Sequence, residues 1–513
     1  MAYRDSALTN EKTIHGIIMS MNGPHRSAGP QQHDEDNMAG MTAAPAATAT
    51  AANVVGELMA KARAAQQVFG RYGQAQLDEV VSAAGWAIME PGRNRTLAEL
   101  AVHDTGLGNV DDKIIKNYRK TYGLMRDLKG AISTGVIAQY PERGIVEIAK
   151  PVGVVAAIVP STNPGATPAN NIINALKCGN AIIVGPSPKG YTTCARLLQF
   201  MHEQLRLVGA PADLVQMLPS PVTRELSTEL MKQADLVVVT GSQNNVRAGY
   251  SSGTPALGVG AGNVVVIVDD TANCADAAAK IMRSKIFDNA TSCSSENSVI
   301  VHAAVYDRML AALKNEGGAL LTPEEKQTLQ RAMFPGGKLS AAITAQSVRK
   351  ICAVAGLTRP DLINAKCLLV EESGTGREYP FSGEKLSPVL AVYRARDFDH
   401  AFNIMRGIYG YMGNGHSCGI YTENEAHIRR LGEEMTVCRV IVKQSHTFAT
   451  GGSFDNGLPF SLSMGCGTWG GNSFSENLNY KHFMNITRIV RTIPENKPSE
   501  EELFGAFWRK YGK

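Results

Sequence analysis

Apolar and polar positions along the chain follow two alternating periods, which predict helices and buried strands in turn. Apolar side chains recur every three or four residues over residues 54–69 and again over 77–89, as in amphipathic helices. Short apolar runs that have the length of buried strands occupy residues 152–159, 181–184, 236–239 and 264–268. Helical stretches separate the first three runs at residues 166–176 and 192–207. Strands that alternate with helices in this way predict an α/β fold with a parallel sheet.

The two ends of the chain depart from this alternation. Residues 1–52 contain a polar run and an Ala/Thr/Pro tract without apolar period, a composition that predicts a disordered N-terminal tail. Near the other end, residues 483–493 have the pattern of a strand. A last helix is predicted to open at Ser499, because Glu502 three residues later completes a capping box.

Composition narrows the class of protein. The 513 residues are 44% apolar with a net charge of +4, which gives no indication of a nucleic-acid partner or a membrane surface. The nine cysteines are odd in number and show neither CxxC pairs nor metal-ligand spacing with histidine, so we predict free thiols and no metal site. No stretch reaches the roughly 18 apolar residues of a membrane span. These features predict a cytoplasmic protein.

Cys293 is the first candidate for chemistry. It lies in a segment of small polar residues, Ala-Thr-Ser-Cys-Ser-Ser-Glu-Asn, whereas most of the other cysteines lie in apolar or helical surroundings. A thiol among hydrogen-bond donors is accessible to a substrate, and its thiolate form is the nucleophile. For such a cysteine considered alone, a loop residue without a catalytic role is the more common interpretation.

Four further segments carry candidate site residues. Asn163 follows a predicted strand, where ligands of open α/β sheets collect, although Asn before Pro also initiates turns. The glycines of residues 254–263 precede a strand instead of opening a helix, so they indicate a close backbone approach and not a dinucleotide fingerprint. The other two segments are 383–389, with Glu384, and the glycine-rich loop 464–473 around Trp469.

Taken together in this order, the segments 160–164, 254–263, 384–388 and 465–473 resemble those of the aldehyde dehydrogenase superfamily from about residue 54 onward. Within it, the chain is similar to the coenzyme A-acylating aldehyde dehydrogenases, including the aldehyde dehydrogenase half of bifunctional alcohol–aldehyde enzymes. The resemblance implies a Rossmann-type cofactor domain over residues 53–270, a catalytic thiol domain over 271–445, and a return segment with a β oligomerisation arm over 446–513. The arm would include residues 131–150 and would support a homodimer or homotetramer.

The resemblance also implies roles for single residues. Cys293 corresponds to the nucleophile and Asn163 to the side-chain donor that stabilises the oxyanion. The residues that would contact the cofactor are Ser161, Thr162, Thr240, Gly241, Ser242, Gly258 and Glu384, of which Glu384 holds the nicotinamide ribose. The cofactor is NAD or NADP, because the family's adenosine-side Lys-Pro motif appears here as Gly185-Pro186.

One departure from the hydrolytic relatives indicates the second half of the reaction. Their general-base glutamate corresponds to Ala256 in this chain. Water, with a pKa of about 15.7, needs a base or a metal to attack a thioester, whereas a thiol with a pKa near 8.5 is already a few per cent thiolate. The sequence therefore predicts acyl transfer to coenzyme A, with hydrolysis to a free acid as the alternative. Glu296 as a substitute base and His416 as a proton carrier are both less favoured than structural roles.

The aldehyde is predicted to be short. Substrates of similar enzymes are acetaldehyde, propionaldehyde and sulfoacetaldehyde, and a small polar aldehyde such as sulfoacetaldehyde is slightly favoured. Residues 446–459 are candidates for shaping the pocket, and Arg439 and Lys443 are candidates for a basic group facing a charged substrate.

Overall fold

The computed structural model describes residues 50–513, so nearly all of the predicted tail (1–52) lies outside the described residues. Helix α1 (Ala51–Phe69) begins two residues inside that segment. It begins there because the Thr50 hydroxyl accepts a hydrogen bond from the Asn53 N–H at 3.3 Å, which caps the first turn.

The first sheet has five parallel strands in the order β5-β4-β3-β6-β7. Their bounds are β3 (Val154–Val159), β4 (Ala181–Pro186), β5 (Val215–Met217), β6 (Leu236–Thr240) and β7 (Ala256–Val259). Every residue of β3 and β4 is buried, as expected for strands covered on both faces. The strands predicted from apolar runs at 152–159, 181–184 and 236–239 are confirmed.

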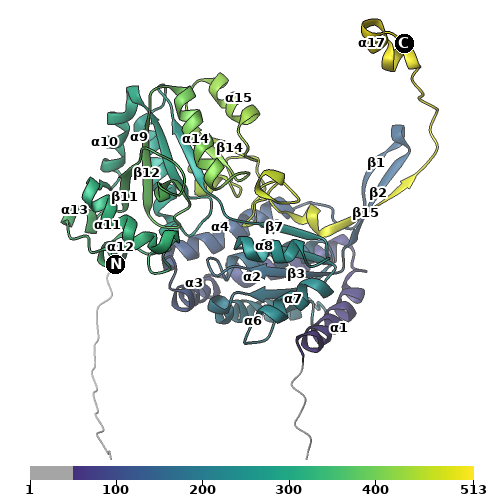
Figure 1. The fold of residues 1–513 in the computed structure, drawn as a ribbon. Coiled ribbons are helices and arrows are strands. Elements are labelled where there is room, and N and C mark those ends of the chain that lie inside the picture. Colours follow the sequence, from purple (N-terminus) through teal and green to yellow (C-terminus); the bar gives the residue numbers. More distant parts are fainter. Residues whose placement is uncertain (1–49) are drawn as a thin grey trace, which may run out of the picture. The chain divides into compact units, whose positions relative to one another are not determined.

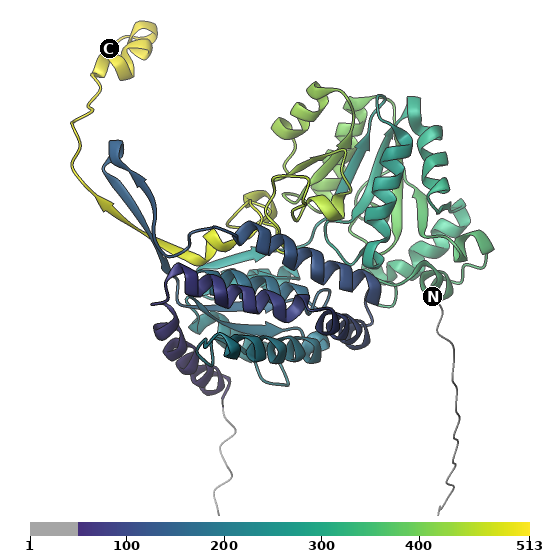
Figure 2. The same cartoon turned by 180° about the vertical axis from the view of Figure 1, so that it is seen from behind.

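Helices cover this sheet, and in the view from behind the purple and blue N-terminal helices lie in front of it (Figure 2). The helices of this part after α1 are α2 (Gln74–Met89), α3 (Pro91–Thr105), α4 (Val110–Leu128), α5 (Ala166–Lys177), α6 (Tyr191–Leu207), α7 (Arg224–Gln233) and α8 (Gln243–Tyr250). All residues of α5 are buried. The predicted helices at 77–89, 166–176 and 192–207 are confirmed.

The second sheet has seven parallel strands in the order β10-β11-β12-β9-β8-β13-β14. Their bounds are β8 (Val264–Val268), β9 (Glu296–His302), β10 (Gly318–Leu320), β11 (Cys367–Glu371), β12 (Val389–Ala395), β13 (Cys418–Tyr421) and β14 (Val440–Val442). Side chains of β8 alternate between two hydrophobic cores, with Val264 and Val266 in one and Val265 and Ile267 in the other.

Helices pack on both faces of this sheet (Figure 1). They are α9 (Cys274–Ile286), α10 (Tyr306–Asn315), α11 (Pro323–Met333), α12 (Val348–Ala355), α13 (Pro360–Ile363), α14 (Phe398–Tyr411), α15 (Glu425–Glu434) and α16 (His446–Ala449). Short 3-10 helices occupy η1 (Pro141–Arg143), η2 (Pro188–Gly190), η3 (Phe287–Ala290), η4 (Ala303–Val305), η5 (Pro335–Gly337), η6 (Pro380–Ser382), η7 (Thr468–Gly470) and η8 (Tyr480–Phe483).

A third, antiparallel sheet joins two segments that are far apart in the sequence. The hairpin β1 (Gly135–Tyr140) and β2 (Ile145–Pro151) is extended by β15 (Met484–Val490), in the order β1-β2-β15 (Figure 1). The chain ends with α17 (Glu500–Tyr511), whose predicted capping box is present: Ser499 Oγ accepts from the Glu502 N–H, and the Glu502 carboxylate accepts from the Ser499 N–H at 2.7 Å. Between residues 50 and 513, no helix combines the length and the hydrophobicity that a membrane crossing requires.

Candidate active site

Cys293 lies in the tight turn that joins η3 to β9. The three residues Asp288, Asn289 and Ala290 have positive φ angles of 50°, 49° and 59°. Each left-handed residue other than glycine costs about 1–2 kcal/mol. This backbone therefore persists only because the surrounding structure holds it, as is common beside reactive groups.

The buried carboxylate of Asp288 holds this turn. It accepts hydrogen bonds from Lys113 Nζ at 3.1 Å, from Lys116 Nζ, and from the Thr291 hydroxyl at 2.6 Å. Burial alone would raise the pKa of Asp288, but the charges of Lys116 and Lys113 outweigh it and hold the pKa below its usual range. The ionised carboxylate thus connects helix α4 to the segment that carries the nucleophile.

Cys293 as a whole residue is partly exposed. Burial of its thiol, together with the neighbouring Glu384 and Cys466, raises the pKa to about 12, whereas Lys120 lowers it. Lys120 is thus a cation of helix α4 that favours the thiolate form of Cys293.

Asn163 follows β3, and its contacts are compatible with both roles that the sequence allowed, a turn residue and an oxyanion donor. Its backbone carbonyl accepts from the Thr167 N–H at 3.2 Å, which starts α5. Its side-chain Oδ1 accepts from Lys116 Nζ at 3.0 Å. Because an ammonium group only donates, the amide NH₂ of Asn163 points away from Lys116. It makes one long hydrogen bond, to the Thr162 hydroxyl at 3.5 Å, which leaves its second N–H for a ligand.

Asn163 and Ser292, the residue before Cys293, line one small pocket of about 30 Å³. Such a volume leaves room for a short chain only. Its lining residues are Lys116, Arg119, Lys120, Asn163, Phe287, Ser292, Thr447, Phe448 and Leu462. Three cations and no carboxylate face this space. Thr447 and Phe448 of the segment 446–459, predicted to shape the substrate pocket, line this space.

The glycine segment 254–263 approaches the nucleophile closely, as predicted. A Cβ added to Gly262 would collide with the Cys293 carbonyl oxygen and would lie 3.1 Å from His416 Cδ2. The His416 Nδ1 is 2.7 Å from the Ser417 hydroxyl, and burial lowers the pKa of His416 to about 3. The lowered pKa favours a neutral His416 imidazole, which lies beside the backbone of Gly262 and Cys293.

Glu384 lies near the same thiol. Burial raises the pKa of Glu384 to about 8, while a hydrogen bond from the Gly262 backbone opposes this shift. Cys466 is buried and lies close enough to Cys293 to affect its pKa. Glu296 is buried on β9, where its Oε1 accepts from the His446 N–H at 3.2 Å, and it is not among the groups that shift the pKa of Cys293.

A wide cleft of about 890 Å³ opens at the carboxyl ends of β3, β4 and β6. Ser161, Gly241 and Ser242 line it, together with Gly185 and Pro186. The other predicted cofactor residues lie beside it: the Thr162 carbonyl accepts from Lys113 at 3.3 Å, the Thr240 and Ser463 hydroxyls are 2.6 Å apart, and Gly258 packs under α8 at the Tyr250 ring.

The cleft suits a nucleotide cofactor. The first turns of α7 and α8 face it with Thr223, Arg224, Asn244 and Asn245, and Arg247 lies on the same wall. Backbone N–H groups at helix N-termini together with arginines bind phosphate groups. The volume and the donor set thus fit a dinucleotide phosphate, and Arg224 and Arg247 were not identified from the sequence.

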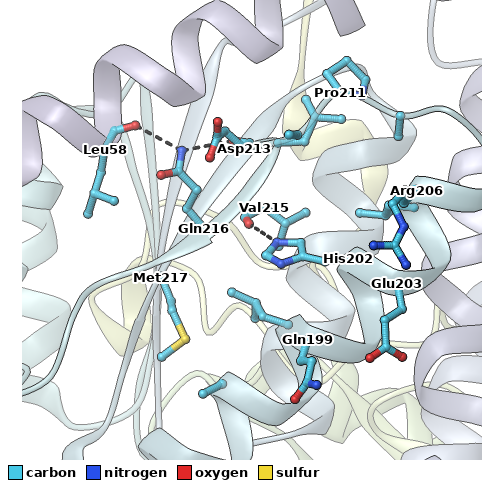
Figure 3. A pocket seen from close by; sticks show the side chains of 16 residues that line it. Leu58, Gln199, His202, Glu203, Arg206, Pro211, Asp213, Val215, Gln216 and Met217 are labelled. Carbon is cyan, nitrogen blue, oxygen red and sulfur yellow. Dashed lines mark hydrogen bonds between the residues drawn. The ribbon is translucent and has the colours of Figure 1, made fainter.

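A second large pocket, of about 720 Å³, lies at the edge of the first sheet and is separate from the nucleophile (Figure 3). It is lined by α6, β5, the loop before β5 and Leu58 of α1. His202 Nε2 lies 2.7 Å from the Val215 carbonyl, and the Gln216 amide donates to the Leu58 carbonyl at 3.1 Å. These hydrogen bonds hold strand β5, at the edge of the sheet, to helices α6 and α1.

The basic groups that line the small pocket come from α4, and the candidates Arg439 and Lys443 are corrected. Arg439 donates to the carbonyls of His416 and Gly465, while Lys443 forms a surface pair with Glu423 at 2.7 Å. Neither lines the pocket. The signal for the cations that do was spacing, because Arg119 and Lys120 lie three and four residues after Lys116 on the same helix.

Comparison with known proteins identifies the family. The sequence model of the aldehyde dehydrogenase family matches residues 29–353. The chain is 60% identical to an acylating sulfoacetaldehyde dehydrogenase of Cupriavidus necator, over 90% of this chain and 94% of the relative. It is 45% identical to an acylating sulfoacetaldehyde dehydrogenase of Bilophila wadsworthia, over 90% of this chain and 99% of the relative.

Among solved structures, an acetylating aldehyde dehydrogenase of Geobacillus thermoglucosidasius is similar with a TM-score of 0.84 and 35% identity, covering 88% of this chain and 98% of that one. The chain belongs to the aldehyde dehydrogenase family. The fold predicted from the resemblance, with parallel α/β sheets around a catalytic cysteine segment, is confirmed.

Proposed function

We propose that this chain is a coenzyme A-acylating aldehyde dehydrogenase, which oxidises a short aldehyde with NAD or NADP and releases an acyl-CoA. The observation that carries the proposal is Ala256, a methyl side chain on β7 where hydrolytic relatives have their general base. High identity to two acylating dehydrogenases over almost their whole length supports it.

The first half of the reaction uses Cys293 and Asn163. The Cys293 thiol loses its proton, and its sulfur forms a bond to the aldehyde carbon, which places a negative charge on the former carbonyl oxygen. The second N–H of the Asn163 amide donates a hydrogen bond to that oxygen. A nicotinamide held by the cleft would supply the hydride acceptor, and loss of hydride from the same carbon leaves a thioester on Cys293.

The second half transfers the acyl group. The coenzyme A thiolate attacks the thioester carbon, and the Cys293 sulfur leaves with the electron pair of the broken carbon–sulfur bond. Thiols supply their own nucleophile near neutral pH, whereas water needs an activating base. Ala256 cannot provide one, so transfer to coenzyme A outpaces hydrolysis.

We propose further roles for the residues of the cofactor cleft. Ser161, Gly241 and Ser242 are proposed to contact the nucleotide phosphates beside Arg224. Glu384 is proposed to hold the nicotinamide ribose, a role supported by its hydrogen bond with the Gly262 backbone and by its effect on the pKa of the Cys293 thiol. Thr162, Thr240 and Gly258 support the cleft from its rim.

Sulfoacetaldehyde is the substrate we propose, because two relatives that cover nearly the whole chain carry that activity in their names. We further propose a cytoplasmic homo-oligomer. The nine cysteines are all free thiols, which fits a reducing compartment. Apolar side chains of α17 stand exposed at Leu503, Phe504 and Phe507, a surface that a second copy would bury.

The test is NAD(P)H formation from sulfoacetaldehyde, acetaldehyde and propionaldehyde, with and without coenzyme A, with the product identified by mass. We expect acyl-CoA and a strict dependence on coenzyme A. Equal turnover without it, giving a free acid, would contradict the proposal and establish a hydrolytic dehydrogenase.

A further inference from the structure

Helix α4 presents an excess of positive charge to the small pocket lined by Asn163 and Ser292, here called the aldehyde pocket. Lys116, Arg119 and Lys120 lie three and four residues apart, which places their side chains on one helix face. All three line the pocket that also contains Asn163, and no carboxylate lines it. Lys116 and Lys120 are buried and Arg119 is partly buried. Buried cations are costly unless they are paired, so partners are expected for them.

Lys116 already has its partners, but the other two cations have donors to spare. Lys120 Nζ donates to the carbonyls of Gly451 at 2.6 Å and Ser461 at 3.1 Å, which uses two of its three N–H groups. Arg119 is bonded only through Nη2, to the Phe448 carbonyl at 2.7 Å and the Ser453 hydroxyl at 3.1 Å. Within residues 50–513, its Nε and Nη1 make no hydrogen bond.

The guanidinium of Arg119 is fixed in place by aromatic rings. It lies 5.2 Å from the Phe448 ring centre and 5.3 Å from that of Phe460, and Arg283 stacks on Phe448 as well, at 4.5 Å. Asp455 is the acidic group that acts on both arginines, and it lies at the surface. One carboxylate against two arginines and Lys120 leaves the pocket with net positive charge.

The distance from this charge to the reaction is short. Lys120 lines the same small pocket as Asn163 and as Ser292, the residue before Cys293. Lys120 and Cys293 also shift each other's pKa. An anionic group that contacts Lys120 in this pocket therefore lies near the segment that carries Cys293. In sulfoacetaldehyde a single methylene separates the sulfonate from the aldehyde carbon, which matches this arrangement.

We propose that Arg119 and Lys120 form an anion subsite in the aldehyde pocket, which binds the sulfonate of the substrate and places its aldehyde carbon at Cys293. The proposal rests on the proposed function and names the residues that select its substrate. Lys120 holds one sulfonate oxygen through its third N–H, and one of the free N–H groups of Arg119, at Nε or Nη1, donates to another. An aldehyde that carries a carboxylate on a chain of different length has the same negative charge, but its aldehyde carbon would not be placed at Cys293 in the same way.

The experiment compares Arg119→Met and Lys120→Met with the matched control Arg126→Met. Arg126 is on the same helix, stacks on Phe460 at 4.8 Å and donates to the Ser453 carbonyl at 3.0 Å, but it does not line the pocket. For each variant, kcat/KM is measured with coenzyme A for sulfoacetaldehyde, succinate semialdehyde and propionaldehyde. Inhibition by ethanesulfonate, an anion without an aldehyde, is measured against propionaldehyde.

We expect both pocket variants to lose roughly 10²- to 10⁴-fold in kcat/KM for sulfoacetaldehyde, the scale on which a site built for a polar group discriminates. In Arg119→Met, kcat/KM for propionaldehyde should change by less than about threefold by the same argument. Lys120→Met should also slow propionaldehyde, because Lys120 lowers the pKa of the Cys293 thiol, but by much less than it slows sulfoacetaldehyde. Ethanesulfonate should inhibit only the wild type and the Arg126 control. A stronger loss for sulfoacetaldehyde than for succinate semialdehyde assigns the site to the sulfonate, and the reverse order assigns it to a carboxylate tail.

Two outcomes would overturn the proposal that Arg119 and Lys120 form an anion subsite. Equal losses for charged and neutral aldehydes would reduce Arg119 and Lys120 to structural anchors of the 448–461 loop. Unchanged sulfoacetaldehyde kinetics in both variants would remove them from recognition. Coenzyme A-dependent turnover of propionaldehyde by the wild type reports the acylating function separately, so failure of the subsite and failure of the proposed function are distinguishable.

Discussion

Lys116 Nζ donates a hydrogen bond to Asn163 Oδ1 across 3.0 Å, and this contact fixes which end of the Asn163 amide faces the substrate. The same ammonium group also binds Asp288 and the Thr291 hydroxyl, at 2.8 Å from the latter. One buried lysine thus connects the oxyanion donor to the strained turn that carries Cys293. Lys116 is a positioning residue, because it acts on the reaction through Asn163.

Replacing Lys116 with Met should lower kcat by roughly 10- to 100-fold, because the Asn163 amide is then free to turn its oxygen toward the developing oxyanion. Asn163→Ala should lower kcat by roughly 10²–10³, the scale of one lost oxyanion donor. KM should change little in either variant. Steady-state kinetics with a saturating cofactor measure both effects.

The double variant separates positioning from general damage. If Lys116 acts through Asn163, the combination of Lys116→Met and Asn163→Ala should be no slower than Asn163→Ala alone. Additive losses would instead mean that Lys116 matters only for the integrity of the Asp288 turn. An unchanged kcat in Asn163→Ala would return Asn163 to the role of a turn residue at the start of α5.

Cys293→Ser should abolish turnover while leaving nucleotide binding in the cleft intact, because the cleft residues Ser161 and Gly241 are independent of the thiol. The measurement pairs an activity assay with NAD(P)H titration by fluorescence. Wild-type protein incubated with aldehyde and cofactor without coenzyme A should carry an acyl group on Cys293 by mass spectrometry. Normal activity of the serine variant would eliminate Cys293 as the nucleophile.

Much of the architecture could be predicted from local patterns. Buried parallel strands are nearly uniform apolar runs, so β3, β4, β6 and β8 were evident from the sequence, and β8 was predicted with its observed bounds. The capping box at Ser499 is a local rule that needs no tertiary information. That residues 131–150 and the strand near residue 483 belong to one arm was predicted only through the family resemblance. The pairing of β15 with β2 was not predicted, because antiparallel partners more than 300 residues apart leave no local signal.

The site could be predicted less completely than the fold. Cys293, Asn163 and Glu384 lie in recognisable motifs, but the cations of α4 lie in an ordinary helix, where charged residues are normally solvated. Their burial arises from packing of α4 against the 446–465 segment, which no spacing rule reveals. For the same reason the charge was sought at Arg439 and Lys443, which precede that segment in sequence but do not line the pocket.

Ala256→Glu tests why this chain transfers acyl groups to a thiol. A carboxylate on β7 at the position of the hydrolytic base should activate water and raise release of the free acid. We expect the acid-to-acyl-CoA product ratio, measured by mass at limiting coenzyme A, to rise at least several-fold. An unchanged ratio would show that water access, and not the missing carboxylate, limits hydrolysis. Ala256→Gln is the control, because it has the same size without a titratable group.

The pH dependence of substrate binding should report Lys120. Burial lowers the pKa of Lys120 to about 7, the neighbouring Arg119 and Lys116 lower it further, and the Cys293 thiol opposes them. Its other contacts on the 446–465 segment are the uncharged carbonyls of Gly451 and Ser461. Because only the protonated amine carries charge, the anion subsite weakens as pH rises above about 7.

KM for sulfoacetaldehyde should therefore increase by up to roughly tenfold per pH unit above pH 7, because the fraction of Lys120 that is protonated and can bind the sulfonate falls by up to that factor. Propionaldehyde, which has no charge to bind, supplies the reference, so that the ratio of the two KM values isolates Lys120 from titration of Cys293 or coenzyme A. In Lys120→Met this ratio should be high and independent of pH between 6 and 9. A wild-type ratio that is flat over the same range would show that Lys120 stays in one protonation state and leaves Arg119 as the pH-independent anchor.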